Sequence, residues 1–321
     1  MNVLYLVVGV ALLTCGGEAL IRGSLSAARR LNVSPLLSGL VIVGFGTSAP
    51  ELVVSINAAI DSRPDIAIGN VVGSNISNIL LILGICAVIT PLTVKPLLLR
   101  RDAFTVVAAS ILFLFLVLFW GSPLGRDDAA IFSIALIAYL IWAYWTERFY
   151  AASSGELHKA EAEEISATPK SVLWTIIAVI LGLLLLISGS HILLIGAIGV
   201  AQFFDVPEAA IGLTLVAVGT SIPELSISVI AAIRRHADVA VGNILGSNIF
   251  NLLGILGVSA FLQPLPINTR ILQFDQWIML GSSLLLLLFL YTERRLSRLE
   301  GGILLVGYGV YVWLGFTEFP G

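Results

Sequence analysis

The chain has 321 residues, of which 58% are hydrophobic and only 12% are charged. Soluble domains carry about 25% charged residues, so this composition excludes an ordinary soluble protein. The formal net charge of −3 excludes no class by itself, because in a membrane protein the positions of the charges matter more than their sum. The composition predicts an α-helical membrane protein with several spanning helices.

Ten segments in chain order are apolar and approach the length of about 20 residues that a helix needs to cross the bilayer. The predicted spans cover residues 3–23, 35–61, 65–89, 103–120, 128–146, 172–197, 207–233, 238–262, 276–291 and 301–316. The first basic residue is Arg22. The first segment therefore lacks the basic start of a signal peptide and is predicted to be a spanning helix. The two cysteines fall in apolar segments, so no disulfide framework is expected.

The basic residues separate sharply between alternate loops. One set of loops carries 14 of the 17 basic residues, and the other set carries only Arg63, Arg126 and Arg270. Basic loops face the cytoplasm, so both termini are predicted outside and the longest loop, 147–171, inside. The expected location is the plasma membrane, which is the inner membrane in a bacterium.

The chain contains an internal repeat. Residues 38–84 align with residues 211–257 at a constant offset of 173, and 26 of the 47 positions are identical. We therefore expect two five-helix repeats, 1–147 and 172–321, joined by a charged cytoplasmic linker over 148–171. An odd number of helices per repeat inverts the second copy, and inverted repeats place a transport site near the bilayer midplane.

Each copy of the repeat interrupts an apolar span with the same polar motif. The stretches are VGFGTSAPELVVS (43–55) and VAVGTSIPELSIS (216–228). A proline inside a helix removes a backbone hydrogen bond and crowds the preceding turn, so Pro50 and Pro223 predict discontinuous second and seventh helices. Glu51 and Glu224 follow directly. A charge at the bilayer centre costs roughly 2.5–3.5 kcal/mol, and a metal cation is the simplest countercharge for this pair.

The helix after each break carries two polar residues on one face. Ser74 and Asn78 are spaced i, i+4, and Ser247 and Asn251 repeat that spacing. Small polar residues alone often serve only helix packing. Beside the broken helices, however, they predict an all-oxygen site around the two carboxylates, formed with Thr47, Ser48, Thr220 and Ser221. Ca²⁺ takes about 6–8 oxygen ligands in flexible geometry.

The paired motifs GTSAPEL…GNVVGSNISN and GTSIPEL…GNILGSNIFN resemble the two alpha-repeats of the cation/calcium exchanger superfamily, in particular its prokaryotic sodium/calcium exchangers. The resemblance implies that Glu51 and Glu224 are the central Ca²⁺ ligands, shared with Na⁺. It further implies three groups of supporting ligands. They are Thr47 and Thr220; Ser74 and Ser247 with the carbonyls of Gly44 and Ala217 at flanking Na⁺ sites; and Ser48, Ser221, Asn78 and Asn251 around the centre.

The resemblance implies a secondary active antiporter that exchanges Na⁺ for Ca²⁺, with the first and sixth helices sliding against a core of helices two, three, seven and eight. It implies no enzymatic activity, no cofactor, no nucleic acid and no obligate protein partner; the partners are the two ions and the bilayer. Some relatives, including potassium-dependent exchangers, carry Asp at the position of Asn251. With Asn in both copies the site has a charge of −2, which favours potassium-independent, electrogenic exchange.

Three other functions remain open from the sequence. A calcium/proton exchanger would titrate the same two glutamates, an intramembrane enzyme would use them as an acid–base pair, and a passive channel would let ions flow without accumulating them. Glu18 and His191 occupy equivalent positions in the first helix of each repeat. Packing, gating and proton transfer are all compatible with that placement.

Overall fold

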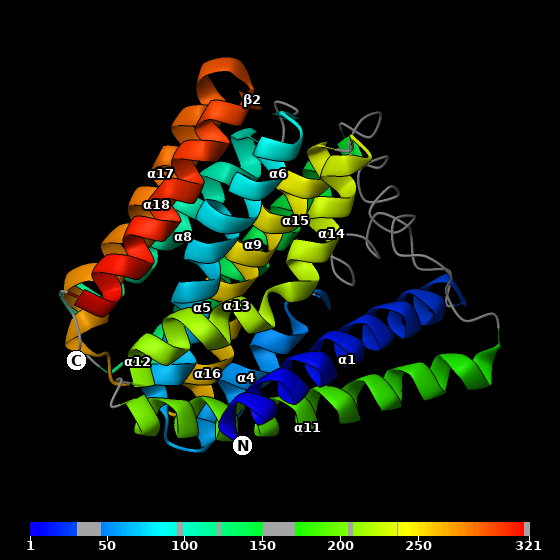
Figure 1. The fold of residues 1–321 in the computed structure, drawn as a ribbon. Helices are drawn as coiled ribbons and strands as arrows, with labels where there is room; N and C mark the ends of the chain where they lie inside the picture. Colours follow the sequence, from blue (N-terminus) through cyan, green and yellow to red (C-terminus); the bar gives the residue numbers. More distant parts are fainter. Residues whose placement is uncertain are drawn as a thin grey trace.

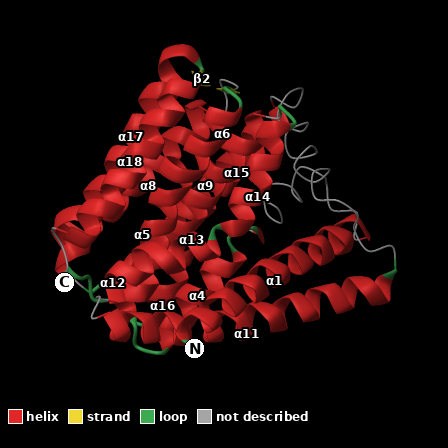
Figure 2. Ribbon diagram, in the orientation of Figure 1, coloured by secondary structure: helices red, strands yellow, loops and turns green. Residues whose placement is uncertain are grey.

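The computed structural model describes residues 1–30, 46–94, 99–120, 123–149, 171–204, 208–235 and 237–317. Between loops and turns these parts of the chain are helical, with one short antiparallel pair of strands, β1 (Leu92–Thr93) and β2 (Arg295–Leu296), and an isolated bridge between Leu124 and Leu265 (Figure 2). The predicted α-helical class is therefore confirmed.

The helices follow the predicted spans closely. Those before the linker are α1 (Asn2–Arg30), α4 (Ala49–Ile60), α5 (Pro64–Ser77), η2 (Asn78–Leu83), α6 (Gly84–Ile89), η3 (Leu99–Ala103), α8 (Phe104–Phe115), η4 (Leu116–Trp120) and α9 (Arg126–Phe149). Those after it are α11 (Val172–Phe204), α12 (Glu208–Ile211), η5 (Gly212–Val216), α13 (Ala217–Thr220), α14 (Ile222–Ile233), α15 (Ala237–Ile249), η6 (Phe250–Ile255), α16 (Leu256–Leu262), η7 (Ile271–Asp275), α17 (Gln276–Glu293) and α18 (Arg298–Thr317). The segments labelled η are π-helical.

Seven helical segments of the described chain are long and apolar enough to cross a membrane, and each overlaps a predicted span. They are Asn2–Gly23, Pro64–Ile89, Arg100–Phe119, Arg126–Thr146, Val172–Phe204, Val239–Leu262 and Ile271–Thr292. A bent pair of helices, Gly212–Thr220 with Ile222–Ile233, makes an eighth if it counts as one span. The predicted count of ten is not confirmed. Part of the second span, 35–45, lies outside the described residues, and α18 is not among the seven.

Helices α1 and α11 lie side by side along one edge of the molecule (Figure 1). Glycines at intervals of seven allow this close approach, and those of the second helix repeat those of the first at the offset of 173: Gly9, Gly16, Gly23, Gly182, Gly189 and Gly196. A Cβ at Gly16 would lie 2.9 Å from the backbone nitrogen of Leu186, and one at Gly182 would lie 2.7 Å from that of Leu20. The two backbones therefore touch directly, as small residues permit in membrane helices.

The segments that follow the two glutamate motifs form the centre of the molecule. In both Pro64–Ile89 and Val239–Leu262, 78% of the spanning window is buried, against 22–50% in the other five candidate spans. In a bilayer such a segment contacts protein on all sides, so its polar side chains face other helices.

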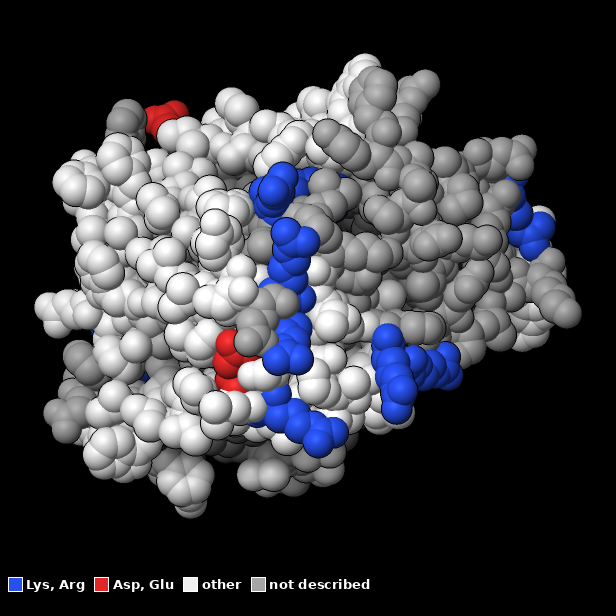
Figure 3. Space-filling view, turned by 90° about the horizontal axis from the view of Figure 1, so that it is seen from above, with Lys and Arg blue, Asp and Glu red and all other residues white. Residues whose placement is uncertain are grey.

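Basic side chains gather on one end of the molecule, the face shown from above in Figure 3, where β2 lies in Figure 1. Exposed arginines near β2 and at the end of α14 are Arg234, Arg235, Arg294, Arg295 and Arg298. All five belong to the loops that the sequence predicts to be cytoplasmic.

Candidate cation site

The seventh predicted span is broken where its motif predicts a break. Helix α13 ends at Thr220, α14 begins at Ile222, and the axes of the two segments differ by 55°. Between them Ser221 leaves helical geometry, with φ −82° and ψ 12°. Pro223 lies in the first turn of α14, where its missing N–H removes no helical hydrogen bond.

Helix α4 starts in the same way. Ser48 has φ −83° and ψ 10°, α4 begins at Ala49, and Pro50 occupies its first turn. Residues 31–45 lie outside the described part of the chain, so the other half of this span has no description. Glu51 and Glu224 each sit in the first turn of their helix, where the free N–H groups and the helix dipole favour a negative charge.

The two carboxylates bond across the repeats. Ser221 Oγ donates to Glu51 Oε1 at 2.8 Å, and Ser48 Oγ donates to Glu224 Oε1 at 3.1 Å. Ser247 Oγ adds a second donor to Glu224 Oε1 at 3.3 Å. Both glutamates are fully buried, and the second carboxylate oxygen of each has no hydrogen-bond partner. The motifs of the two repeats thus meet at one place in the interior.

The two threonines reach amides in the opposite repeat. Thr220 Oγ1 donates to Asn70 Oδ1 at 3.1 Å, and Thr47 Oγ1 donates to Asn243 Oδ1 at 3.4 Å. Thr47 Oγ1 also lies 3.3 Å from Ser247 Oγ. The hydroxyls predicted as ligands therefore belong to the same polar cluster as the carboxylates.

Four residues of this cluster were missed by the sequence prediction. Asn70 Nδ2 donates to Ser55 Oγ at 2.9 Å and to the Glu51 carbonyl at 3.2 Å, and Asn243 Nδ2 donates to Ser228 Oγ at 3.1 Å. These asparagines and serines occupy equivalent positions in the two repeats. The sequence could have indicated them, because the same residue type occurs at both equivalent positions at the offset of 173. They orient the helices behind the glutamates.

The carbonyl of Ala217, predicted as part of a flanking site, is already shared by several donors. It accepts hydrogen bonds from Thr220 Oγ1 at 3.1 Å, from the Ser221 N–H at 3.1 Å and from Ser74 Oγ at 3.4 Å. Ser74 and Ala217 are thus brought together across the repeats. Gly44, the equivalent predicted position, lies outside the described residues.

The asparagines of the next turn are arranged unequally. Asn78 Nδ2 donates to Asn248 Oδ1 at 2.9 Å. The equivalent residues by repeat position are Asn251 and Asn75, and neither amide group has a hydrogen-bond partner although both side chains are buried. The amide oxygen of Asn251 is therefore buried without a hydrogen-bond partner. This is compatible with its predicted role as a cation ligand.

The ligand atoms that this cluster offers to a cation are oxygens of carboxylate, hydroxyl, amide and backbone carbonyl groups. The described residues contain no group of three or more His, Cys, Asp and Glu side chains that could hold a metal, so a cation here would depend on two carboxylates supplemented by neutral oxygens. Hard cations such as Ca²⁺ bind carboxylates, amide oxygens and water. Of the arginines whose burial is described, Arg101 and Arg270 are buried, and both bond aspartates away from this cluster.

Glu18 and His191 do not join the cluster. Both side chains are exposed, and Glu18 forms an i, i+4 ion pair with Arg22 on α1.

Comparison with known proteins identifies the family of this chain. A family model described as "Sodium/calcium exchanger protein" matches residues 1–145 and 174–317. The chain belongs to the sodium/calcium exchanger family. The resemblance predicted from the two motifs is therefore confirmed, and this family member is a multi-pass membrane protein of a transporter family.

Individual relatives match over nearly the whole length of this family member. The putative antiporter CaxA of Alkalimonas amylolytica is 37% identical, with 98% of each chain covered. The sodium/calcium exchanger MaX1 of Methanosarcina acetivorans is 31% identical, with 97% of each chain covered. Among solved structures, the sodium-calcium exchanger NCX_Mj soaked with Na⁺ and Sr²⁺ superposes with a TM-score of 0.66 at 31% identity, with 97% of each chain covered.

Proposed function

We propose that this protein is a secondary active antiporter that exchanges Na⁺ for Ca²⁺ across the membrane by alternating access. The cations bind in turn at the cluster around Glu51 and Glu224. The choice of Na⁺ and Ca²⁺ as the exchanged ions is supported by the family and by relatives whose names state sodium/calcium exchange.

One observation carries the assignment of the site. Each buried glutamate accepts a hydrogen bond from the serine of the opposite repeat, and each keeps one buried carboxylate oxygen without a partner. Buried charges are costly unless they are paired or coordinate a metal. A cation between the repeats satisfies both free oxygens at once, and neutralises both charges if it is divalent.

We propose the ligands from the hydrogen bonds of the cluster together with the family resemblance, which alone supplies Gly44. Glu51 and Glu224 hold the cation. The hydroxyls of Thr47, Ser48, Thr220, Ser221, Ser74 and Ser247, the amide oxygens of Asn78 and Asn251, and the carbonyls of Gly44 and Ala217 complete the coordination of Ca²⁺ or of several Na⁺ ions. Because the serines bond across the repeats, a relative movement of the repeats changes the coordination, which couples binding to the change of access.

The charge of the site sets the expected electrical behaviour. Two carboxylates give −2, which one Ca²⁺ neutralises and three Na⁺ exceed by one positive charge. We propose that three Na⁺ exchange for one Ca²⁺, so that each cycle moves one net charge without a requirement for K⁺. The basic face in Figure 3 supports a cytoplasmic orientation of that face and an extracytoplasmic position of both termini.

The decisive experiment is uptake of labelled Ca²⁺ into proteoliposomes loaded with Na⁺ and diluted into Na⁺-free buffer. We expect Ca²⁺ to accumulate against its gradient, with an equal pH on both sides and a protonophore present. Accumulation driven by a pH gradient alone would identify a calcium/proton exchanger instead. Ca²⁺ flux that never exceeds equilibrium would identify a channel.

A further inference from the structure

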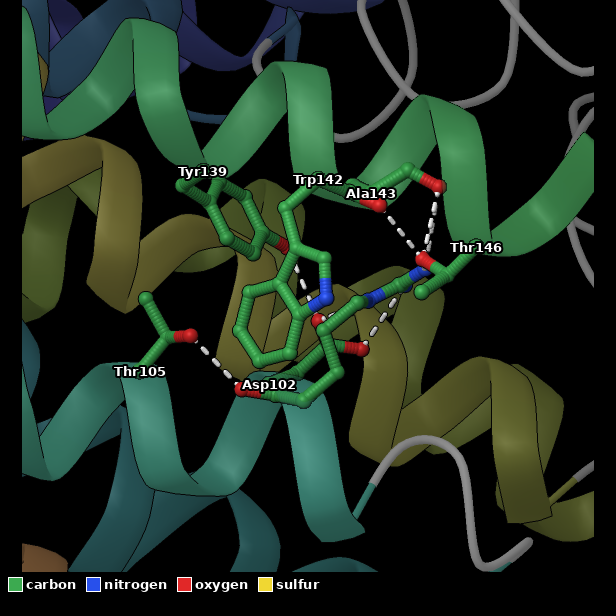
Figure 4. A network of polar contacts seen from close by, with 7 residues as sticks. Asp102, Thr105, Tyr139, Trp142, Ala143 and Thr146 are labelled. Atoms are coloured by element: carbon green, nitrogen blue, oxygen red, sulfur yellow. Dashed lines mark hydrogen bonds and ion pairs between the residues drawn. The ribbon is translucent and has the colours of Figure 1, made fainter.

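Among the described residues, two clusters of buried charged side chains lie outside the cation site. In the first, Arg101 and Asp102 of η3 form a bidentate ion pair, with Nε to Oδ1 at 2.6 Å and Nη2 to Oδ2 at 3.0 Å. Tyr139 of α9 donates its hydroxyl to Asp102 Oδ1 at 3.0 Å. Figure 4 shows Tyr139 reaching from α9 towards Asp102. Each of the three residues is no more than 6% exposed.

The arginine of this cluster also ties η3 to the far end of α9. Arg101 Nη1 donates to the Ala143 carbonyl at 3.4 Å and to Thr146 Oγ1 at 3.3 Å. The cluster thus ties the start of the α8 span to α9 by direct side-chain contacts.

A second cluster of the same chemistry lies in the other repeat. Arg270 Nε donates to Asp275 Oδ2 at 3.3 Å, and Tyr311 of α18 donates its hydroxyl to Asp275 Oδ1 at 3.0 Å. All three residues are buried, with Asp275 fully so. The guanidinium group lies against the backbone of Gly315, where a Cβ would come within 2.6 Å of Nη2.

The two clusters are related by the repeat, but their arginines are not. Asp102 and Asp275 are separated by 173 positions, and Tyr139 and Tyr311 by 172. Arg101 directly precedes its aspartate, whereas Arg270 lies five positions before its own. The carboxylate and the phenol therefore come from equivalent positions of the two repeats, whereas the guanidinium comes from a different position in each. Inheritance of the repeat explains the aspartates and tyrosines, but not the arginine that each aspartate has acquired; a requirement for the assembled group explains both.

Each cluster is attached to an element that packs against a cation-site helix of the other repeat. The segment η3, which carries Asp102, contacts α15, and α15 carries Asn243 and Ser247. The segment η7, which carries Asp275, contacts α5 with its Ser74, as does α17, which continues η7. A clamp in one repeat therefore supports the site residues of the other.

We propose that Arg101, Asp102 and Tyr139 in one repeat, and Arg270, Asp275 and Tyr311 in the other, are positioning clamps for the cation site, an inference that rests on the proposed function. Each clamp fixes the π-helical start of a span, and through it the helix that presents hydroxyl and amide ligands. The arginine also neutralises the buried aspartate, so that Asp102 and Asp275 do not compete with the site glutamates for the transported cation.

The alternative is that the clamps serve only stability, and buried ion pairs allow the two roles to be separated. Replacing a buried ion pair by apolar residues of similar volume is often neutral or stabilising. The double variants R101M/D102L and R270M/D275L therefore remove a clamp while retaining a packed interior. Tyr139→Phe and Tyr311→Phe remove only the hydroxyl group, and Tyr291→Phe, an exposed tyrosine of α17, is the matched control.

The test measures Na⁺-driven Ca²⁺ uptake in proteoliposomes across a range of Ca²⁺ concentrations, together with the melting temperature of each variant in detergent. We expect each double variant to raise the KM for Ca²⁺ about 10-fold, as loss of groups that orient metal ligands does. Melting temperatures should change little, because the tyrosine hydroxyl that loses its acceptor offsets the gain from removing the buried ion pair. Tyr139→Phe and Tyr311→Phe should shift KM in the same direction by a smaller factor, and Tyr291→Phe should leave KM unchanged.

The outcomes separate the two proposals. If the wild-type protein shows Na⁺-driven uptake while folded clamp variants keep its KM and maximal rate, the clamps are refuted and the proposed function stands. A lower melting temperature with unchanged KM in the tyrosine variants assigns the clamps to stability alone and also refutes the inference. If the wild-type protein shows no such uptake, both proposals fail together.

Discussion

Replacing Glu51 by glutamine tests the cation site most directly. The glutamine side chain has nearly the same shape, and its amide oxygen can still accept the hydrogen bond that Ser221 Oγ donates at 2.8 Å. The substitution therefore removes one negative charge from the interior and leaves the packing of α4 in place. Because Glu51 is fully buried, water does little to screen the loss.

The size of the effect follows from the charges. Two unit charges 4 Å apart interact by about 4 kcal/mol at an effective dielectric constant of 20, so a divalent cation loses about 8 kcal/mol of attraction. Part of this attraction is recovered, because glutamine keeps an amide oxygen and Ca²⁺ accepts amide oxygens and water as neutral ligands. A net loss of about 3 kcal/mol remains, which weakens Ca²⁺ binding by roughly 100-fold. Glu224→Gln should lose at least as much, because Glu224 accepts hydrogen bonds from two serines.

Isothermal titration calorimetry of the purified protein with Ca²⁺ measures the change in affinity, and counterflow of labelled Ca²⁺ in proteoliposomes measures its consequence for transport. Asp127→Asn, an exposed residue at the start of α9, controls for the loss of one acidic charge. Its affinity should match that of the wild-type protein. Wild-type Ca²⁺ affinity in folded Glu51→Gln would show that this carboxylate does not hold the cation, and the proposed site would have to be abandoned.

Three further predictions concern the donors, the helix pair and the transported charge. Ser221→Ala and Ser48→Ala each remove a hydrogen bond to a buried carboxylate, which is worth about 1.5–3 kcal/mol. Each substitution should raise the Ca²⁺ dissociation constant by about 10-fold or more. A dissociation constant that stays unchanged in calorimetry would contradict the hydrogen bonding across the repeats. Gly16→Ala should lower the melting temperature, because a Cβ would lie 2.9 Å from the Leu186 nitrogen and overpacking costs about 1–3 kcal/mol. Gly281→Ala is the control and should leave the melting temperature unchanged, because a Cβ there would meet no neighbouring segment within 4 Å. A potential of 100 mV acts on one net charge with about 2.3 kcal/mol and should change the Ca²⁺ accumulation ratio by roughly 50-fold; a ratio independent of a valinomycin-set potential would exclude electrogenic exchange.

The sequence predicted that the two glutamate motifs meet in the interior, but not the hydrogen bonds between them. Glu51 and Glu224 could be paired because a gapless repeat with inverted topology brings equivalent positions together. Which serine bonds which glutamate could not be predicted. Ser48 is three residues from Glu51 yet donates its hydrogen bond to Glu224. This pairing depends on how α4 and α14 are placed relative to each other. Local spacing favours neighbours in the chain, whereas the site is built from contacts between repeats.

The buried clamps show a second limit. Arg101 and Arg270 entered the prediction only as basic residues of loops, on opposite sides of the membrane. A charged residue at the end of an apolar span looks the same in the sequence whether it faces water or the protein interior. The distinction depends on Tyr139 and Tyr311, which lie 37 and 36 positions along the chain from the aspartates that they bond. Such long-range partners leave no local periodicity to detect.

The unequal asparagines have a consequence for how the protein can be observed. Asn78 and Asn251 are equivalent in sequence, as are Asn248 and Asn75, yet one amide pair is bonded and the other is open. The surroundings of the two pairs differ, since Ser77 and Leu81 of the first repeat correspond to Phe250 and Gly254 of the second. Isotope-edited infrared spectra of these side-chain amides would therefore distinguish the bonded pair from the open one, without any label attached to the surface.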